Sequence, residues 1–257
     1  MSFTEELMSR EALRLADHDY LDYHGRRFKY VVGKCVQLRP EPKSRVLDVG
    51  RSHLSASLLE HYDSVWTLGF PLDDAEGFGH LAGIAPSRKE YAGHIEFDLN
   101  NTQAIEVIPT DIRFDLISFA ETIEHLYTAP ELVLHALRDL LTDDGIIVCQ
   151  TPNAAALHKR IALLLGRNPY ERLRIDVRNR GHIREYTKRE LIDVGRVAGL
   201  ELVDHEYAEY FGRQGSALRK LAVRITETVA RVFPTLSRGQ TIVFRKSLAE
   251  PALLART

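Results

Sequence analysis

Two carboxylates and an imidazole stand close together in the pattern E-x-x-E-H, formed by Glu121, Glu124 and His125. On a helix, positions i, i+3 and i+4 share one face, so these three side chains would point the same way. Such a group can hold a divalent cation, and His182, further along the chain, is a candidate fourth ligand. In the alternative chemistry no metal is needed, and His125 hydrogen-bonds a substrate or acts as a base.

A second candidate group lies in the segment VLDVG at 46–50, where Asp48 and Gly50 close a short apolar run. A carboxylate at this position can orient the following loop, and a glycine lets the backbone approach a ligand. The same residues also occur in an ordinary tight turn between a strand and a helix, so this segment alone is a weak signal.

The elements that must position these residues alternate between strands and helices. Apolar, β-branched runs predict strands at 45–49, 65–70, 94–98, 114–119 and 145–150. Helices are expected at 9–38, 54–61, 129–141, 157–165, 188–199 and 216–233. This alternation favours a doubly wound α/β fold, a mostly parallel sheet with helices on both faces. Two late strands, at 202–207 and 241–245, favour an antiparallel pair at one edge.

In such sheets a ligand binds at the carboxyl ends of the strands, which here means just after Val49, Phe70, Phe97, Phe119 and Gln150. Both candidate groups follow strands in this list. The sequence therefore predicts one site, at one edge of the sheet, built from both groups.

The fourth and fifth expected strands carry the most distinctive motifs. The segments FDLISFAETIEHL at 114–126 and LLTDDGIIVCQTPN at 140–153 resemble the corresponding motifs of class I S-adenosylmethionine-dependent methyltransferases. The segments VLDVG and HIEFD, at 46–50 and 94–98, fall at the separations of that family, and the resemblance covers about 44–207. It implies a Rossmann-like sheet of seven strands and S-adenosylmethionine as the cofactor.

The resemblance also implies where the cofactor would lie. Asp48 and Gly50 would line its methionine end, with Ser52 offering a backbone N–H in the loop that follows. Asp98 and Leu99 would face the adenine. The residues beside the cofactor at the end of the fourth strand would be Phe119 and Ala120.

Two positions depart from the family pattern. The loop that commonly reads G-x-G-x-G is here GRSHL at 50–54, and Gly69 stands where an acid usually holds the ribose hydroxyls. Asp73 or Asp74 is a candidate substitute for that acid. The loss of such a charged hydrogen bond costs about 1.5–3 kcal/mol, which weakens a site without necessarily abolishing it. A non-catalytic interaction protein with a methyltransferase fold is therefore an alternative.

The E-x-x-E-H pattern by itself resembles ubiquinone-pathway O-methyltransferases. Together with the later H-x-x-E-Y-T at 182–187, it resembles the metal site of small-RNA 3′-terminal 2′-O-methyltransferases. The resemblance implies Glu121, Glu124, His125 and His182 as ligands of Mg²⁺ or Mn²⁺, and His125 and His182 as catalytic groups. A cation at an acceptor hydroxyl would lower the pKa of that hydroxyl. The same motif is common in class I enzymes that need no metal.

Charge is distributed unevenly along the chain. The net charge is −2, yet the segment 158–189 holds ten Lys and Arg residues against three acids. We expect a helical lid at 1–43, a methyltransferase domain at 44–250 and a basic acceptor-binding insert at about 154–185. The expected acceptor is a small, lipid-linked or sugar-linked anion, whereas an RNA terminus is the alternative that the net charge disfavours. A solvated helical face would explain the basic segment equally well.

The amphipathic helix expected at 216–233 has three interpretations: it contacts a membrane surface, forms a homodimer, or packs on its own domain. The protein would accordingly be a monomer or a homodimer. The two cysteines, Cys35 and Cys149, lie in apolar runs, which is typical of buried reduced thiols. With no apolar stretch of about 20 residues and no signal-peptide pattern at the N-terminus, a cytoplasmic location is expected.

Overall fold

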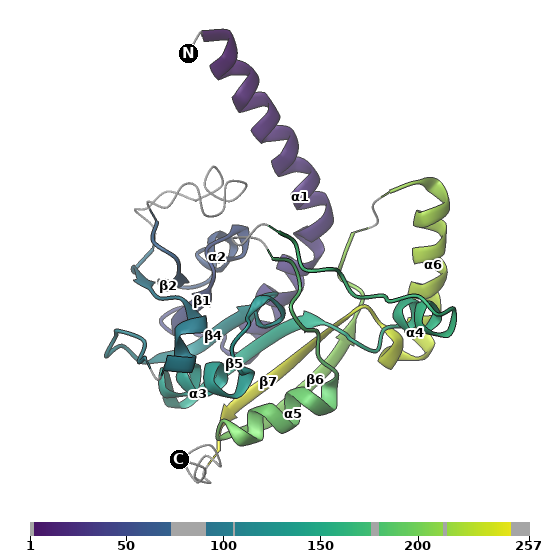
Figure 1. Ribbon diagram of the computed structural model, residues 1–257. Helices are drawn as coiled ribbons and strands as arrows, with labels where there is room; N and C mark the ends of the chain where they lie inside the picture. The colour runs from purple at the N-terminus through teal and green to yellow at the C-terminus, as the bar shows by residue number, and fades with distance from the viewer. Residues whose placement is uncertain (1–2, 73–90, 105, 176–179, 213–214, 248–257) are drawn as a thin grey trace.

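The computed structural model describes residues 3–72, 91–104, 106–175, 180–212 and 215–247 (Figure 1). Its centre is one seven-stranded sheet with the order β3-β2-β1-β4-β5-β7-β6. The strands are β1 (Arg45–Val49), β2 (Ser64–Gly69), β3 (Gly93–Glu96), β4 (Phe114–Ala120), β5 (Leu141–Pro152), β6 (Leu200–Ala208) and β7 (Gly239–Lys246). The five strands from β3 to β5 are parallel to one another, as the sequence predicts.

The antiparallel element at one edge is the pair formed by β6 and β7. Strand β7 runs antiparallel to both its neighbours, β5 on one side and the edge strand β6 on the other. Strand β6 therefore runs in the same direction as the parallel strands. The predicted class, a mostly parallel Rossmann-like sheet of seven strands with an antiparallel component at its edge, is confirmed.

Helices cover both faces of the sheet (Figure 1). They are α1 (Phe3–Leu38), α2 (His53–Leu58), α3 (Pro130–Asp139), α4 (Leu157–Leu164), α5 (Lys188–Val197) and α6 (Ala217–Val232). Neighbouring residues of a strand point to opposite faces, so Val46 packs against α1 and α2, whereas Leu47 packs in the core that includes α3 and α5. In the C-terminal part of α1, the side chains of Val31 and Cys35 are fully buried against the sheet.

Local sequence explains where the helices that flank the site begin. Helix α3 begins with Pro130, whose fixed backbone angle suits the first helical position. Helix α5 begins after Thr187, and Glu190 accepts a hydrogen bond from the Thr187 backbone N–H at 2.8 Å. Both cysteines are buried free thiols. Within the described part of the chain, no helix is long and apolar enough to cross a membrane.

The strand register sets the level of the strand ends. Asp48 pairs with Thr67 on β2 and with Ser118 on β4, and Ala120 at the end of β4 pairs with Gln150 on β5. The carboxyl ends of four parallel strands therefore lie side by side. Residues that follow these strands meet at one edge of the sheet, where a ligand of this fold would bind.

Candidate active site

Two glycines leave the ends of β1 and β2 open. Gly50 has a φ of +89°, a conformation that favours glycine, and its N–H donates to the Leu68 carbonyl at 2.7 Å. Among the residues that the structure describes, a Cβ added to Gly50 would meet no atom within 4 Å, and one added to Gly69 would meet only the Gly50 Cα, at 3.9 Å. The backbone here borders open space, so a ligand can approach it closely.

Asp48 lies beneath this opening and is buried. It accepts a hydrogen bond from the Ser55 hydroxyl at 2.6 Å, which ties the end of β1 to α2. Burial raises the pKa of Asp48 from 3.8 to about 7, because the charged form loses its hydration. A neighbouring cation, such as the ammonium group of an amino-acid moiety, would favour the ionised form.

Ser52 has a different role from the one the sequence suggested. Its hydroxyl accepts from the Leu54 N–H at 3.1 Å, and its own N–H donates to the Ser55 hydroxyl at 3.1 Å. These bonds form the capping box that begins α2. Both polar groups of Ser52 are thus used inside the loop. The sequence predicts that the Ser52 N–H donates to a cofactor, and the geometry corrects this expectation.

The expected adenine side follows β3. Asp98 accepts from the Asn100 N–H at 2.9 Å and begins the 3-10 helix η1 (Leu99–Ala104). The side chain of Leu99 is buried in the core, so only its backbone can face an adenine ring. Asp73 and Asp74, the candidate substitutes for a ribose-binding acid, lie outside the described residues.

The end of β4 separates two expected cofactor neighbours. The side chain of Phe119 is fully buried in the core, whereas Ala120 is partly exposed where the strand ends. Alternation along the strand explains the difference, because successive side chains point to opposite faces. Ala120 can therefore contact a cofactor through its side chain, and Phe119 can do so only through its backbone.

The E-x-x-E-H segment does not form one helical face, contrary to expectation. The Glu121 N–H still donates to the Gln150 carbonyl of β5 at 2.7 Å, so this residue prolongs the sheet. Its φ of +49° then turns the chain into η2 (Ile123–His125), a 3-10 helix of three residues. The sheet hydrogen bond overrides the helical spacing, and it separates Glu121 from the helical turn that holds Glu124 and His125.

Glu121 and Glu124 nevertheless form a buried acidic pair. Burial raises the pKa of both carboxyls, and the charge of Glu124 raises that of Glu121 further. Thr151 donates to Glu124 at 2.9 Å, and the buried Arg27 guanidinium of α1 lies 4.0 Å from Glu121. The pair is therefore harder to ionise than exposed carboxyls would be.

The two histidines predicted to act together lie in contact. The ring centroids of His125 and His182 are 4.9 Å apart, at an interplanar angle of 78°. The Nδ1 of His125 lies 2.9 Å from the Gly181 carbonyl, and the Nδ1 of His182 lies 3.1 Å from a Glu185 carboxylate oxygen. Both partners are acceptors, so each Nδ1 carries a hydrogen, and the neutral tautomer compatible with this geometry has its lone pair on Nε2.

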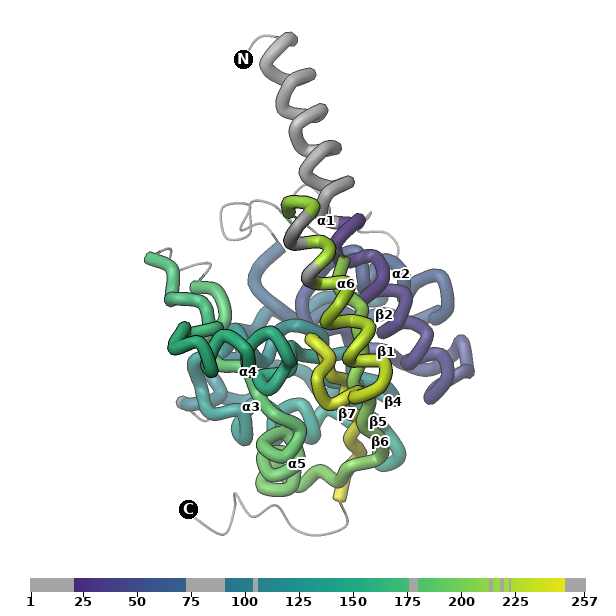
Figure 2. Tube along the Cα trace, turned by 90° about the vertical axis from the view of Figure 1, so that its right-hand side faces the viewer, coloured from purple at the N-terminus to yellow at the C-terminus, as the bar shows by residue number. Residues whose placement is uncertain are grey.

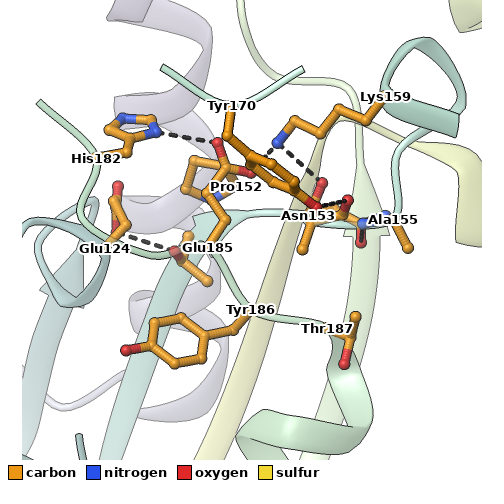
Figure 3. Close-up of polar contacts among 12 residues, drawn as sticks. Glu124, Pro152, Asn153, Ala155, Lys159, Tyr170, His182, Glu185, Tyr186 and Thr187 are labelled. Carbon is orange, nitrogen blue, oxygen red and sulfur yellow. Dashed lines mark hydrogen bonds and ion pairs between the residues drawn. The ribbon is translucent and has the colours of Figure 1, made fainter. Parts of the chain in front are cut away.

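Behind His182 lies a buried ion pair that connects α4 to the segment 181–187 (Figure 3). Glu185 accepts from the Lys159 ammonium, which also donates to the Asn153 carbonyl at 3.2 Å. Burial lowers the pKa of Lys159 to about 8 and that of His182 to about 4, and the nearby charges of Lys159 and Arg174 add to the effect on His182. His182 is therefore neutral at pH 7.

Within the described part of the chain, one group of side chains could hold a cation: Glu124, His125 and His182. One ligand atom from each lies within 4.8 Å of the others. Glu121 is outside this group, so the expected set of four ligands is reduced to three. A carboxylate with two imidazoles suits Mn²⁺, Fe²⁺ or Zn²⁺ better than Mg²⁺, which prefers oxygen ligands.

A sequence model described as "Methyltransferase domain" matches residues 23–205, most of the chain. The chain belongs to this family. It is an S-adenosylmethionine-dependent methyltransferase. No curated protein sequence matches it.

Solved structures share the fold of this methyltransferase at low sequence identity. One is a chain of the complex between the Haloferax volcanii Trm112 methyltransferase activator and a methyltransferase. Its TM-score is 0.59 and its identity 13%, over 93% of this chain and 96% of that one. Another is a S-adenosylmethionine-dependent methyltransferase from Clostridium acetobutylicum, with a TM-score of 0.52 and 14% identity over 95% and 99% of the two chains. A third, from Archaeoglobus fulgidus, has a TM-score of 0.50 and 15% identity over 85% and 94%.

The residues present fit S-adenosylmethionine at the open strand ends. A Cβ at Gly50 would fill space next to the backbone, and the buried carboxyl of Asp48 lies below. The methyltransferase lacks the usual acid at Gly69, so contacts from elsewhere would have to hold a ribose. The described residues therefore fit the methionine end of the cofactor more clearly than its ribose.

Sequence reasoning missed two members of the methyltransferase site, Glu185 and Lys159. Glu185 had a signal, because it stands three residues after His182 in the motif H-x-x-E-Y-T. Lys159 had none: it is one of many cations in the basic segment, and only the structure shows that it is buried, with 5% of its surface exposed.

Proposed function

We propose that this methyltransferase methylates a hydroxyl group of an anionic acceptor, with His182 as the general base. The observation that carries the proposal is the orientation and charge state of His182. Its Nδ1 is engaged by Glu185, and burial keeps the ring neutral, so its Nε2 is free to accept a proton at pH 7. His125 lies against the same ring and supports the same role.

The cofactor supplies an electrophilic methyl group on a positively charged sulfur. His182 accepts the proton of the acceptor hydroxyl while the oxygen–carbon bond forms and the sulfur–carbon bond breaks. Glu185 and Lys159 hold the imidazole in one orientation and balance each other's charge. Proximity and orientation supply most of the rate enhancement in such a displacement, and a positioned base contributes about 10²–10⁴-fold.

The anionic character of the acceptor is inferred from the cations around the histidines. Arg174 lies close enough to lower the pKa of His182, and the Arg180 guanidinium lies over the Tyr127 ring at 5.0 Å. Both belong to the basic segment before His182. Phosphate and carboxylate groups are the natural partners of such guanidinium groups. A small, lipid-linked or sugar-linked acceptor fits this arrangement.

A His182→Ala variant tests the proposal. Methyl transfer from labelled S-adenosylmethionine to a panel of hydroxylated phosphates and carboxylates should fall at least 100-fold in kcat. The Kd for S-adenosylhomocysteine, measured by calorimetry, should stay within about twofold. The exposed His61 provides a matched control, and His61→Ala should leave both values unchanged. Unchanged turnover in His182→Ala would exclude the role, and absence of cofactor binding in the wild type would favour a non-catalytic protein.

A second proposal is a divalent cation at Glu124, His125 and His182, supported by the convergence of these three groups. Bound there, the cation would act as a Lewis acid toward an acceptor hydroxyl. Calorimetric titration of Mn²⁺ should then show a site that His182→Ala removes and Glu121→Gln retains, because Glu121 lies outside the three-ligand group. No heat of Mn²⁺ binding in the wild type would contradict this proposal.

An RNA terminus is the alternative acceptor. Continuous tracking of phosphates needs a broad basic surface, and the net charge of −2 argues against one. Retention on heparin at physiological salt, together with methylation of a short RNA, would favour this alternative over a small anionic acceptor.

A further inference from the structure

Helix α6 presents two different faces. Val223, Glu227 and Ala230 lie on one face and turn toward the domain, with Glu227 and Ala230 buried. Leu221, Ile225 and Val232 form a second stripe, since positions four and seven residues apart nearly coincide around a helix. All three are exposed, and Val232 has 70% of its surface accessible. The helix therefore packs on its domain and still exposes an apolar stripe on the opposite side.

The C-terminal end of α4 and the segment after it are also apolar and exposed. Leu164 and Leu165 have 87% and 67% of their surface accessible, and Leu173 and Ile175 follow at exposed positions. Lys159, on the same helix, turns inward to Glu185. Helix α4 thus has one polar contact with the active site and an apolar end that contacts little of the protein.

The two helices that carry these exposed residues lie on the same side of the molecule. Helices α4 and α6 contact each other and both face the viewer in Figure 2. We call the exposed residues of 160–175 and 220–233 the α4–α6 face. Exposed apolar patches of this kind usually mark an interaction site, because a monomer gains nothing from hydrating them.

The charges around the α4–α6 face have one sign. Within the described residues of these two segments, the exposed cations are Arg160, Arg167, Arg172 and Arg174 in the first and Lys220, Arg224 and Arg231 in the second. Glu171 is the one exposed acid among them. On α6, the cations flank the apolar stripe on one side. The rest of the chain must carry an excess of acid, because the net charge is −2.

We propose that the α4–α6 face docks on the surface of an anionic lipid bilayer. Apolar side chains between exposed cations are the pattern of helices that lie in a membrane interface. The apolar groups enter the boundary of the acyl chains, while Arg and Lys contact lipid phosphates. The acidic remainder of the protein would face away from the bilayer.

A second copy of the chain fits this face less well. In a symmetric dimer the same patch contacts itself, so the cations of one protomer would oppose those of the other. Like charges brought together in this way are unfavourable unless counterions or acids intervene. An anionic bilayer neutralises the same cations, and charge complementarity therefore selects lipid over self-association.

Docking in this orientation has a consequence for the substrate. Helix α4 contributes both to the docking face and, through Lys159, to the support of His182. The methylated hydroxyl would then belong to a lipid-linked acceptor presented at the bilayer surface. This last step rests on the proposed function, whereas bilayer docking does not.

Vesicle flotation of the full chain tests the docking. We expect the protein to float with vesicles of 70% phosphatidylcholine and 30% phosphatidylglycerol at 0.1 M salt, and to remain behind with pure phosphatidylcholine. The double variant Leu164→Glu/Leu165→Glu should lose at least 90% of this binding. Arg224→Gln/Arg231→Gln should weaken it about thirtyfold, because each surface cation contributes roughly fivefold.

The control is Val107→Glu, which places a charge at another highly exposed apolar position, between η1 and β4. It should bind vesicles as the wild type does. Equal loss in this control, binding to neither kind of vesicle, or equal binding to both kinds would overturn the proposal. A dimer that Leu164→Glu/Leu165→Glu dissociates would assign the face to a second copy instead. Cofactor affinity, measured on the same variants, should be unchanged, so failure of docking and failure of the proposed function are distinguishable.

Discussion

Individual hydrogen atoms determine the chemistry of the two histidines. Each Nδ1 faces a fixed acceptor, the Gly181 carbonyl for His125 and the Glu185 carboxylate for His182. The side chains therefore have no freedom to exchange tautomers without losing a hydrogen bond. The lone pair of the neutral His182 ring is therefore held on Nε2, where a hydroxyl proton or a cation can use it.

Asp48 provides a prediction at the same scale. Its pKa is about 7 in the folded protein, whereas in the unfolded chain the group loses its proton near pH 4. Between these values the folded state binds a proton that the unfolded state has released, so stability falls as the pH rises. Asp48→Asn removes this dependence. Relative to the wild type, the variant should gain roughly 2 kcal/mol between pH 5 and pH 8.

Urea unfolding at the two pH values measures this difference. The exposed Asp63 supplies the control, and Asp63→Asn should follow the pH dependence of the wild type. The same pH slope in Asp48→Asn and the wild type would contradict the explanation. Cofactor affinity should fall in Asp48→Asn, because the buried carboxylate lies below the open strand ends.

At the scale of elements, the segment 181–187 is held in place from three sides. The Ile183 N–H donates to the Glu124 carbonyl at 2.7 Å, and Gln240 of β7 donates to the Tyr186 carbonyl at 2.6 Å. The Lys159–Glu185 ion pair supplies the third connection, from α4. These contacts fix the backbone that carries His182.

A double-mutant cycle measures the Lys159–Glu185 pair. Glu185→Gln should cost about 3–5 kcal/mol of unfolding free energy, because it leaves a buried ammonium without its counterion. Adding Lys159→Met should recover much of that loss. The exposed pair Arg184–Glu190 is the matched control, and its coupling should stay below about 1 kcal/mol. Additive losses at Lys159 and Glu185 would refute the coupling.

The sequence predicted elements better than contacts. The strands and the Thr187 cap follow local patterns of apolar and capping residues, which are visible in a single chain. The prediction that Glu121, Glu124 and His125 share one helical face was wrong, because a hydrogen bond to Gln150 on another strand holds Glu121 in the sheet. The partnership of Lys159 and Glu185 joins residues 26 positions apart in sequence, so no local pattern could reveal it.

For the whole molecule, the cofactor should act as a stabilising ligand. S-adenosylhomocysteine at 100 times its Kd adds about 2.7 kcal/mol to the free energy of unfolding, which corresponds to a rise of about 5–10 °C in Tm. Gly50→Ala should abolish this rise, because the added methyl group occupies the space next to the protein backbone that would contact the cofactor.

Gly166→Ala is the matched control for backbone strain. Like Gly50, Gly166 has a positive φ, of +69°, and no atom of the described part of the chain lies within 4 Å of an added Cβ, but it stands at the end of α4. Both variants should lose about 1–2 kcal/mol of stability without ligand. Only Gly166→Ala should keep the ligand-induced rise in Tm. An equal rise in Gly50→Ala would place the cofactor elsewhere.

The position of β7 also has a consequence for biosynthesis. Strand β6 joins the sheet only through β7, which follows it in the chain and lies between it and β5. A ribosome that has made β6 has therefore made a strand with no partner to pair with. The nascent protein must keep the edge of β5 uncovered until the residues of β7 leave the exit tunnel. During that interval the exposed edge is open to chaperones and to aggregation.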